Sequence, residues 1–371
     1  MMQEFYAAAI KHTEAPLCDE LRELGFKSVR LNRGGIPFRG TWRDGWRACL
    51  QSRIAQRIYV LLSRFPVSSN DQLYDGVRAI DWSPYLTPNK TLSVNAVTVG
   101  STLDHSGFVA LKTKDAIVDQ LRETQGGRPS VDRDNADVRV FVYLANNKAV
   151  VYVDLSGESL HRRGYRQQAG DAPLRETLAA AILRLSGWDR TTPLIDPLCG
   201  SGTIAIEAAL WAANIAPGLS RERFGFERWA CFSEDDSTDL RTLRGEMRAL
   251  ATKEVPRIVG TDNDPNVLDM ARANARAAGV RLTFREQSAL DVQRDGGRRT
   301  LVSNPPYGVR IEAEPEFPQH LAAAISKLHD WRVALLAGTN VYEKSINLRP
   351  KEALPLVNGS IDCRLLIYEV P

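Results

Sequence analysis

The sequence predicts an α/β protein whose C-terminal part is a Rossmann-like, seven-stranded, mostly parallel sheet with helices on both faces. Three observations predict this fold. A glycine turn at 200–202 follows a short apolar run and precedes a helix-forming segment, Asp262 closes the next β-prone run, and a polar loop at 304–307 closes another. Open α/β sheets bind ligands beyond the carboxyl ends of their strands, so these three features are expected to form one site.

The chain of 371 residues is too long for one hydrophobic core, so it is expected to contain several domains. We expect a ferredoxin-like module at 1–65, a second α/β module at 66–160, a basic linker at 161–173 and the Rossmann-like domain at 174–371.

The first module is predicted from a β-α-β-β-α-β order. The expected elements are a strand at 5–10, a helix at 14–24 ended by Gly25, strands at 27–31 and 36–38, a helix at 42–51 and a strand at 57–62. In the second module we expect strands at 91–97, 138–144 and 149–154 and a helix at 112–122.

The C-terminal domain is predicted to open with a helix at 174–185. It continues with a strand at 193–195, a helix at 203–214, a strand at 257–262, a helix at 266–278, and strands at 281–285, 300–303, 331–336 and 363–370. The last segment alternates too little for a strand with one face in water, so it should be paired on both sides.

Composition excludes several classes of protein. The five cysteines are scattered and form no Cys-x-x-Cys pair, which argues against a disulfide framework and a zinc site. The five histidines lack the spacing of metal ligands. No apolar run approaches the length of a membrane helix, and the first six residues show no cationic segment ahead of a long apolar stretch, so we expect no signal peptide. We expect a cytoplasmic protein, monomeric, without metal or membrane.

The loop at 304–307 indicates the chemistry. It reads Asn304-Pro305-Pro306-Tyr307 and resembles the catalytic loop of methyltransferases that act on an exocyclic or amide nitrogen. Such an amine is a poor nucleophile, and the Asn304 side chain with the Pro305 carbonyl can each accept one of its hydrogens. The prolines stiffen the loop, and Tyr307 offers a ring for a flat base. An ordinary turn after a strand is the alternative.

The glycine turn indicates the cofactor. A strand-turn-helix unit with Gly200 and Gly202 suits a nucleotide cofactor at a helix N-terminus. Asp196 is unsuited to the pyrophosphate of a dinucleotide but suits the cationic amino-acid part of S-adenosylmethionine (SAM), which we therefore favour. The expected SAM-binding residues of this turn are Asp196, Pro197, Leu198, Cys199, Gly200, Ser201, Gly202 and Thr203.

Asp262, with Asn263, is the expected ribose contact, although it lies much further from the turn than the usual spacing of about 20 residues. The excess is an insertion at 214–256, which could cover the site or form a surface helix pair. Ser288 and Ala289 occupy the position expected to contact adenine, with Asp291 as the competing candidate. A nucleophilic role for Cys199 is disfavoured, because the turn needs only a small side chain there.

Basic residues indicate an RNA partner. Arginines crowd the segment 30–64 among Trp42, Trp46 and Tyr59, the composition of a nucleic-acid surface, although a solvated helix face is equally compatible. The candidate RNA contacts along the chain are Arg33, Arg43, Arg47, Lys112, Lys114, Arg133, Arg162, Arg163 and Arg166.

Further segments carry a family resemblance. The stretches 73–82, 114–119 and 129–133 resemble a THUMP domain, an RNA-binding module. The stretches 154–166 and 172–182 are similar to the THUMP-containing guanine-N2 RNA methyltransferases, in particular the bacterial 23S rRNA enzymes of the RlmL type. The similarity covers nearly the whole chain. Some members carry a second methyltransferase half that has no counterpart before Pro371.

By that resemblance, the first two modules bind RNA, the Asn304 loop receives a flipped guanine, and one reaction, methylation of its N2, is implied. Two alternatives remain: a related enzyme that modifies guanine-N2 in tRNA, and an RNA-binding assembly factor with an inactive methyltransferase fold. Intact Asp196, Gly200, Gly202, Asp262 and the Asn304–Tyr307 loop argue against the second.

Overall fold

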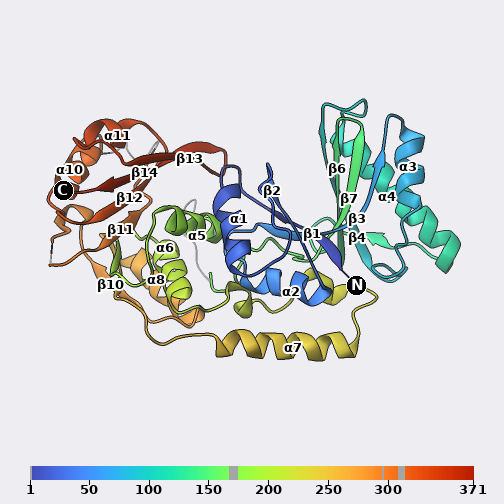
Figure 1. Ribbon diagram of the computed structural model, residues 1–371, viewed down its shortest axis with the longest axis horizontal. Coiled ribbons are helices and arrows are strands. Elements are labelled where there is room, and N and C mark those ends of the chain that lie inside the picture. Colours follow the sequence, from blue (N-terminus) through green and yellow to red (C-terminus); the bar gives the residue numbers. More distant parts are fainter. Residues whose placement is uncertain (1, 167–173, 295, 308–313) are drawn as a thin grey trace.

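The structure, a computed structural model, describes residues 2–166, 174–294, 296–307 and 314–371. The chain folds into two halves that lie side by side, each built on a seven-stranded sheet (Figure 1). The mixed α/β fold class and the Rossmann-like architecture of the second half are confirmed. Within the described residues, no helix has both the length and the apolar character needed to cross a membrane.

One continuous sheet runs through the first two modules. Its strand order is β2-β1-β3-β7-β6-β4-β5, and β3 pairs with β1 on one side and β7 on the other. The elements are β1 (Gln3–Ala8), α1 (Glu14–Glu23), β2 (Gly35–Gly40), α2 (Trp42–Gln51), β3 (Arg57–Pro66), α3 (Asn70–Arg78), β4 (Thr91–Val99), α4 (Ser106–Gln125), β5 (Ser130–Val131), β6 (Val138–Ala145) and β7 (Lys148–Asp154).

Local sequence explains most of these boundaries. Gly25 ends α1 with φ +78°, a conformation that glycine adopts without strain. Thr41 and Asp44 form a reciprocal capping box at the start of α2. The predicted strand at 27–31 is wrong: Lys27 makes only an isolated bridge to Arg39, because Ser28 takes a left-handed φ of +55° that interrupts an extended run.

The second sheet has the order β10-β9-β8-β11-β12-β14-β13. The first five strands are parallel, and β14 and β13 are antiparallel. Its elements are α5 (Glu176–Leu185), β8 (Leu194–Asp196), α6 (Thr203–Ala212), β9 (Ile258–Asp262), α8 (Pro265–Ala277), β10 (Thr283–Glu286), η3 (Ala289–Asp291), β11 (Thr300–Ser303), α10 (Phe317–Ile325), β12 (Arg332–Ala337), α11 (Val341–Ser345), β13 (Glu352–Asn358) and β14 (Ile361–Glu369).

The closing strand is paired on both sides, as predicted, because β14 bonds to β12 and to β13. Alternate residues of the central strands enter two different cores. Val302 packs with α5 and α6, whereas its neighbour Leu301 packs with α10. Helices therefore cover both faces of this sheet (Figure 1). Strand β13 was not predicted, because Pro355 lies in its middle, and an edge strand tolerates proline there.

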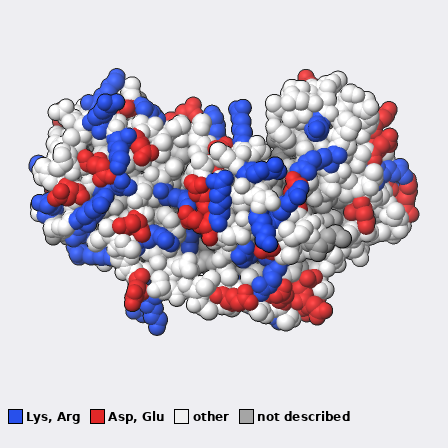
Figure 2. Space-filling view, viewed as in Figure 1, with Lys and Arg blue, Asp and Glu red and all other residues white. Residues whose placement is uncertain are grey.

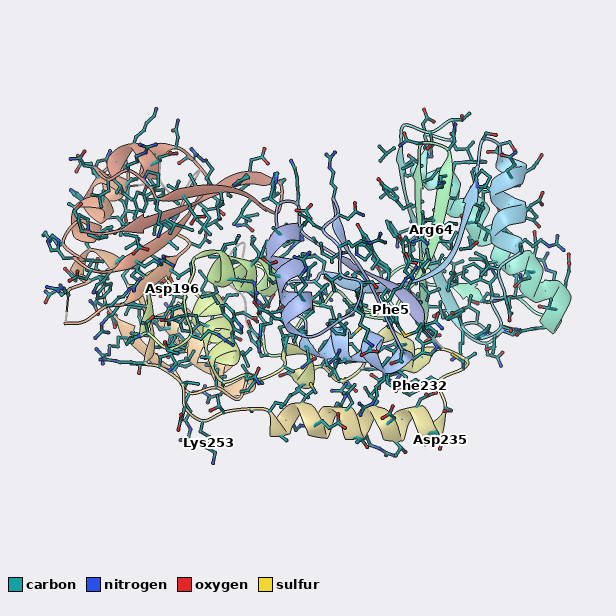
Figure 3. All side chains as sticks on the ribbon, viewed as in Figure 1. Phe5, Arg64, Asp196, Phe232, Asp235 and Lys253 are labelled. Carbon is teal, nitrogen blue, oxygen red and sulfur yellow. The ribbon has the colours of Figure 1, made fainter. Side chains whose placement is uncertain are left out.

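The insertion joins the two halves instead of covering the predicted site. It contains η1 (Pro217–Ser220), η2 (Gly225–Arg228) and α7 (Glu234–Ala249), and α7 runs beneath α2 (Figure 1). Figure 3 marks its course with Asp235 near one end, Lys253 beyond the other, and Phe232 on the side of the first half. Phe226 stacks on Trp46 with ring centroids 5.4 Å apart.

Candidate active site at the carboxyl edge of the second sheet

The glycine turn between β8 and α6 has the conformation that the sequence predicts. Gly200 and Gly202 both have positive φ, +50° and +85°, and the Cys199 N–H donates to the Thr261 carbonyl at 2.9 Å. A Cβ on Gly202 would lie 3.0 Å from that of Ala271 on α8. Glycine here permits both the left-handed turn and the close packing of α6 against α8.

We expect Gly202→Ala to destabilise the fold by roughly 1–3 kcal/mol, because alanine is strained at this φ and crowds Ala271. Gly245, in α7, is the matched control, since a Cβ there meets no atom within 4 Å. Gly245→Ala should stabilise by about 0.5–1 kcal/mol through its higher helix propensity. Urea denaturation measures both, and equal effects would contradict the prediction.

Asp196 is a buried carboxylate at the end of β8, 1% exposed. It accepts a hydrogen bond from the Ser303 hydroxyl at 2.7 Å and one from the Leu198 N–H at 3.3 Å. Burial, helped by the nearby charge of Asp262, raises its pKa to about 7. The Ser303 bond also ties the end of β8 to the end of β11, beside Asn304.

Asp262 holds the turn as well as facing the predicted ribose position. Its Oδ2 accepts from the Gly200 N–H at 2.9 Å and its Oδ1 from the Asp264 N–H at 3.2 Å. A carboxylate has about four acceptor sites, so capacity for two ligand hydroxyls is left. The neighbouring Asn263 is exposed.

We expect Asp262→Ala to weaken SAM binding by about 1.5–3 kcal/mol, since bonds to a charged acceptor are lost. Asp269→Ala, on the exposed face of α8, is the control and should leave the affinity unchanged. Titration calorimetry measures both. Unaltered SAM affinity in Asp262→Ala would remove this residue from the cofactor site.

The residues predicted near adenine lie after β10. Ser288 caps η3, where its Oγ accepts from the Leu290 N–H at 3.2 Å, and Ala289 is buried. The competing Asp291 has an exposed side chain, and its carbonyl accepts from the Gln287 amide. An adenine contact by Ser288 therefore stays a prediction.

The Asn304 loop follows β11 directly, and residues of the following segments bond to it and pack against it. The Pro306 carbonyl accepts from the Tyr342 hydroxyl at 2.7 Å, and the Tyr307 hydroxyl accepts from the Asn358 amide at 2.5 Å. The Tyr307 ring lies so close to Gly338 that a Cβ there would be 2.6 Å from it. One side of the ring predicted to stack with a base is therefore occupied. Gly308, also in this motif, lies outside the described residues.

Asn304 differs from its neighbours in the loop. Its Oδ1 is buried, and no donor among the described residues reaches it. Buried acceptors in native proteins are nearly always satisfied, so such an atom requires an explanation. Asn304 directly follows Ser303, whose hydroxyl bonds Asp196, at the carboxyl edge where an open α/β sheet binds its ligands.

Sequence reasoning missed several supporting residues. Asn274 on α8 is 1% exposed, and its amide donates to the Ser201 carbonyl at 3.1 Å, which supports the glycine turn. Its spacing from Leu268 and Ala271 places it on the buried face of α8, and this polar residue in an apolar stripe was a usable signal. Ser303, Tyr342 and Asn358 carried no comparable signal.

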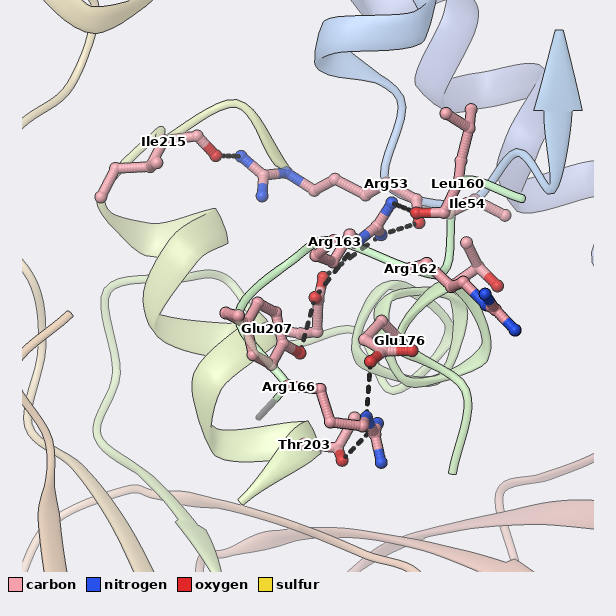
Figure 4. Close-up of polar contacts among 12 residues, drawn as sticks. Arg53, Ile54, Leu160, Arg162, Arg163, Arg166, Glu176, Thr203, Glu207 and Ile215 are labelled. Atoms are coloured by element: carbon pink, nitrogen blue, oxygen red, sulfur yellow. Dashed lines mark hydrogen bonds and ion pairs between the residues drawn. The ribbon is translucent and has the colours of Figure 1, made fainter. Parts of the chain in front are cut away.

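The described part of the predicted basic linker, 161–166, contacts both halves of the chain (Figure 4). Arg163 is 2% exposed and meets Glu207 of α6, which is fully buried, at 3.4 Å. It also donates to the carbonyls of Leu160 and Arg53. The prediction that Arg163 contacts RNA is therefore wrong, because its guanidinium is buried and bonded to partners inside the protein.

Arg166 is also turned inward. It donates to Glu176 at 2.7 Å, to the Leu174 carbonyl and to the Thr203 hydroxyl (Figure 4). These contacts hold the first turns of α5 and α6 together and contradict an RNA contact by this side chain. Arg162 is the exposed arginine of the three and pairs with Glu158. Positions 167–173 of the linker lie outside the described residues.

The predicted arginine patch does not form one free surface. Arg43 pairs with Asp239 and Glu246 of α7, while Arg47 pairs with Asp44 and lies over the Phe26 ring. Trp46 is buried against the insertion, and Trp42 packs against Trp229. The prediction of a free basic patch centred on Arg43 and Arg47 is therefore wrong, because both side chains pair with acids of the protein.

The remaining basic candidates lie apart from these. Arg33 and Arg133 are exposed. Lys112 lies over the Tyr74 ring, and Lys114 pairs with Asp115. RNA contacts by these four residues stay predictions.

The structure disfavours a nucleophilic role for Cys199. Cys199 is buried, and burial raises the pKa of its thiol, which keeps it protonated and a weak nucleophile. Across the described ranges, no three His, Cys, Asp or Glu side chains are grouped so that they could hold a metal ion.

Family models match three consecutive parts of the chain. Residues 4–59 match the RlmL ferredoxin-like domain, residues 67–154 the THUMP domain, and residues 163–367 the RMKL-like methyltransferase domain. Membership of a methyltransferase family bears out the prediction that SAM is the cofactor.

A ribosomal RNA large subunit methyltransferase K/L from Methylococcus capsulatus is 40% identical over 100% of this chain and 52% of its own length. The chain thus spans about half the length of the curated relatives it matches. A solved protein, named as a putative methyltransferase and complexed with SAH, is 30% identical, with a TM-score of 0.87 and coverage of 100% of this chain and 98% of that one.

A protein from Listeria monocytogenes, named as a predicted N6-adenine-specific DNA methylase, is 30% identical with a TM-score of 0.89, over 100% of this chain and 97% of that one. The domain matches, the whole-chain relatives and the geometry of the site agree. The chain belongs to the RMKL-like methyltransferase family, with an RlmL-type ferredoxin-like domain and a THUMP domain ahead of the catalytic domain.

Proposed function

We propose that this chain transfers the methyl group of SAM to the exocyclic N2 of a guanine in 23S rRNA. The methyltransferase family and the name of the Methylococcus capsulatus relative support the reaction class and the RNA. The THUMP match supports an RNA substrate. The relative is about twice as long, so the proposal concerns the activity of the part present here.

The observation that carries the proposal is the buried, unpartnered Oδ1 of Asn304, considered among the described residues. An exocyclic amine has two N–H groups, and Asn304 Oδ1 with the Pro305 carbonyl can each accept one of them. When both hydrogens are accepted, the nitrogen becomes pyramidal. Its lone pair is then no longer delocalised into the base ring and can attack the methyl group. The stiff loop holds these acceptors in place before the substrate arrives, so the reaction needs no strong base.

The cofactor would lie across the carboxyl edge of β8, β9 and β10. The turn from Gly200 to Thr203 would face its amino-acid part, with Asp196 beside the ammonium group. Asp262 would accept the ribose hydroxyls, and Ser288 and Ala289 would flank the adenine. Bound SAM supplies an electrophilic methyl group on a sulfonium.

A pH dependence follows from Asp196. With a pKa of about 7 in the ligand-free protein, its carboxyl group carries a proton below that pH and has to release it to pair with an ammonium group. Ligand binding should therefore strengthen as pH rises through about 7. We expect SAM affinity measured by calorimetry to increase from about pH 6 to 8, with proton release to the buffer at the lower pH.

Asp196→Asn is the control for this pH effect and should bind SAM weakly with a much flatter pH profile. The analogue 5′-methylthioadenosine, which lacks the ammonium group, should show little pH dependence with the natural protein. A pH profile retained in Asp196→Asn would assign the titration to another group.

The first half would hold the RNA while one guanine leaves the stack and enters the loop. Flipping a base costs a few kcal/mol in unstacking, which RNA contacts elsewhere on the protein can offset. We propose that residues 1–65 and 66–160 supply those contacts and that 174–371 carries out the transfer. An rRNA substrate would place the protein in the cytoplasm.

Transfer of tritiated methyl groups to 23S rRNA lacking its modifications, and to tRNA, tests the proposal when followed by nucleoside analysis. N2-methylguanosine in the rRNA is the expected product. Label in tRNA alone would favour a tRNA enzyme, and label on adenine N6 would refute guanine specificity. RNA binding without transfer would identify an inactive assembly factor.

A further inference from the structure

The outer face of the first sheet carries side chains that the hydrophobic core does not use. Phe5, Val60 and Val153 point inward and belong to the core shared with helices α1 to α4. Their strand neighbours Tyr6, Tyr59 and Tyr152 alternate to the other face, where Tyr59 and Tyr152 pack against each other and are each only 9% exposed. The sheet therefore has one face packed against helices and one face without a share in that packing.

Aromatic rings run side by side across this outer face. Strand pairing places Tyr6 beside Tyr59 and Phe141 beside Tyr152, and Tyr59 stacks on Phe141 with centroids 5.3 Å apart. The row continues to Tyr143 on β6, which is 39% exposed. Val97 and Val99 on the adjoining β4 are 43% and 51% exposed, so apolar surface remains in water here.

Arginines surround the rings. The outward positions of these strands contribute Arg39, Arg57, Arg64 and Arg139, against the acids Glu4 and Asp154. Glu4 pairs with both Arg39 and Arg64, whose side chains stay 58% and 47% exposed. Figure 2 shows Lys and Arg gathered along the hollow between the THUMP lobe and the rest of the molecule, and Figure 3 places Arg64 there.

This arrangement differs from the arginine patch on α2, where the acids of α7 neutralise Arg43. On the outer face, the Glu4 carboxylate is shared by two accessible arginines, which leaves a positive charge on the same face as the partly exposed Tyr143 ring. Positive charge next to aromatic surface is suited to bind unpaired RNA, because its phosphates pair with cations and its unpaired bases stack on aromatic rings.

We propose that the outer face of the first sheet is a platform for unpaired nucleotides of the RNA substrate. Bases stack at the exposed end of the aromatic row, on Tyr143, and phosphates contact Arg39 and Arg64. The inference rests on the proposed function, since it takes the substrate to be RNA. It names the outer sheet face as the surface that binds the RNA, and unpaired nucleotides as the part of the RNA that is bound.

Fluorescence anisotropy with a labelled single-stranded oligouridine of about 12 nucleotides tests the platform. Tyr143→Ala and Arg64→Gln should each raise Kd about tenfold, the lower range for loss of one stacked base or one phosphate contact. The controls are Phe108→Ala, a 42% exposed aromatic on α4, and Arg241→Gln on the exposed side of α7. Both should stay within about twofold of wild type.

Glu4→Gln should change Kd in the opposite direction and is therefore the sharper test. It removes the carboxylate that neutralises Arg39 and Arg64, so it should lower Kd severalfold, whereas general damage to the sheet would raise it. Calorimetric SAM affinity equal to wild type in every variant shows that the fold is kept.

The platform is overturned if Tyr143→Ala and Arg64→Gln bind the oligouridine within about twofold of wild type, or if the controls lose as much affinity. That result would leave the face to a protein partner. The binding assay uses neither SAM nor methyl transfer, so failure of the proposed function is separate. A chain that binds RNA through this face but methylates no guanine would refute only the activity.

Discussion

Replacement of Asn304 by alanine is expected to lower the single-turnover rate of methyl transfer by about 10²- to 10³-fold, the usual cost of removing one preorganised hydrogen-bonding group at a reacting centre. SAM and RNA affinities should change little. The interaction with the amine strengthens as the nitrogen becomes tetrahedral, so the loss falls on the chemical step and not on binding.

Two variants separate the acceptor from the loop that carries it. Asn304→Asp keeps an acceptor but adds a charge beside Asp196, so its rate should fall as well. Tyr342→Phe removes the hydroxyl that donates to the Pro306 carbonyl and leaves Asn304 intact. Its effect should be markedly smaller, because the loop also rests on Gly338 and Asn358.

Rapid-quench measurement with saturating SAM and RNA gives these rates directly. A wild-type rate in Asn304→Ala would end the proposal that this loop prepares an amine. A methyl group found on a carbon or a ribose oxygen would do the same.

The positions of the site residues could be predicted because each follows a strand of a parallel sheet. Asp196, Asp262 and Asn304 are far apart in sequence, yet parallel strands end at the same edge. Two hydrogen bonds link the ends of these strands in the structure, from Ser303 to Asp196 and from Gly200 to Asp262. Local patterns also placed α2, whose capping box is encoded within four residues.

The roles of basic residues could not be predicted in the same way. Arg163 and Arg162 are neighbours in a basic run, but one is buried and the other is exposed. The difference depends on Glu207, 44 residues further along the chain, and nothing local to the linker records that pairing. Likewise, Arg43 meets its acids on α7 only because the insertion folds back under the first half.

The outer sheet face shows the same limit. Its aromatic residues come from β1, β3, β6 and β7, with β1 and β7 more than 130 positions apart along the chain. Alternation within one strand shows which residues share a face, but only the joint pairing of β3 with β1 and β7 makes that face continuous.

Replacement of Arg163 by methionine is expected to destabilise the fold by about 3–5 kcal/mol, since it leaves Glu207 as a buried charge without its cation. Tyr165 would still donate to Glu207 at 3.0 Å, but the carbonyls of Leu160 and Arg53 would lose their donor. Adding Glu207→Leu should recover part of the loss by removing the isolated charge. Recovery should stay incomplete, because those two carbonyls remain unpaired.

Arg162→Met is the matched control, because its side chain is 66% exposed and its pair with Glu158 lies in water. Exposed pairs of this kind contribute about 0–1 kcal/mol. Urea denaturation followed by tryptophan fluorescence gives the three free energies of unfolding. Since α6 carries Glu207 and begins directly after the glycine turn, Arg163→Met should also weaken SAM binding at temperatures where the protein is still folded. Equal stability of Arg163→Met and Arg162→Met would show that the buried pair does not hold the two halves together.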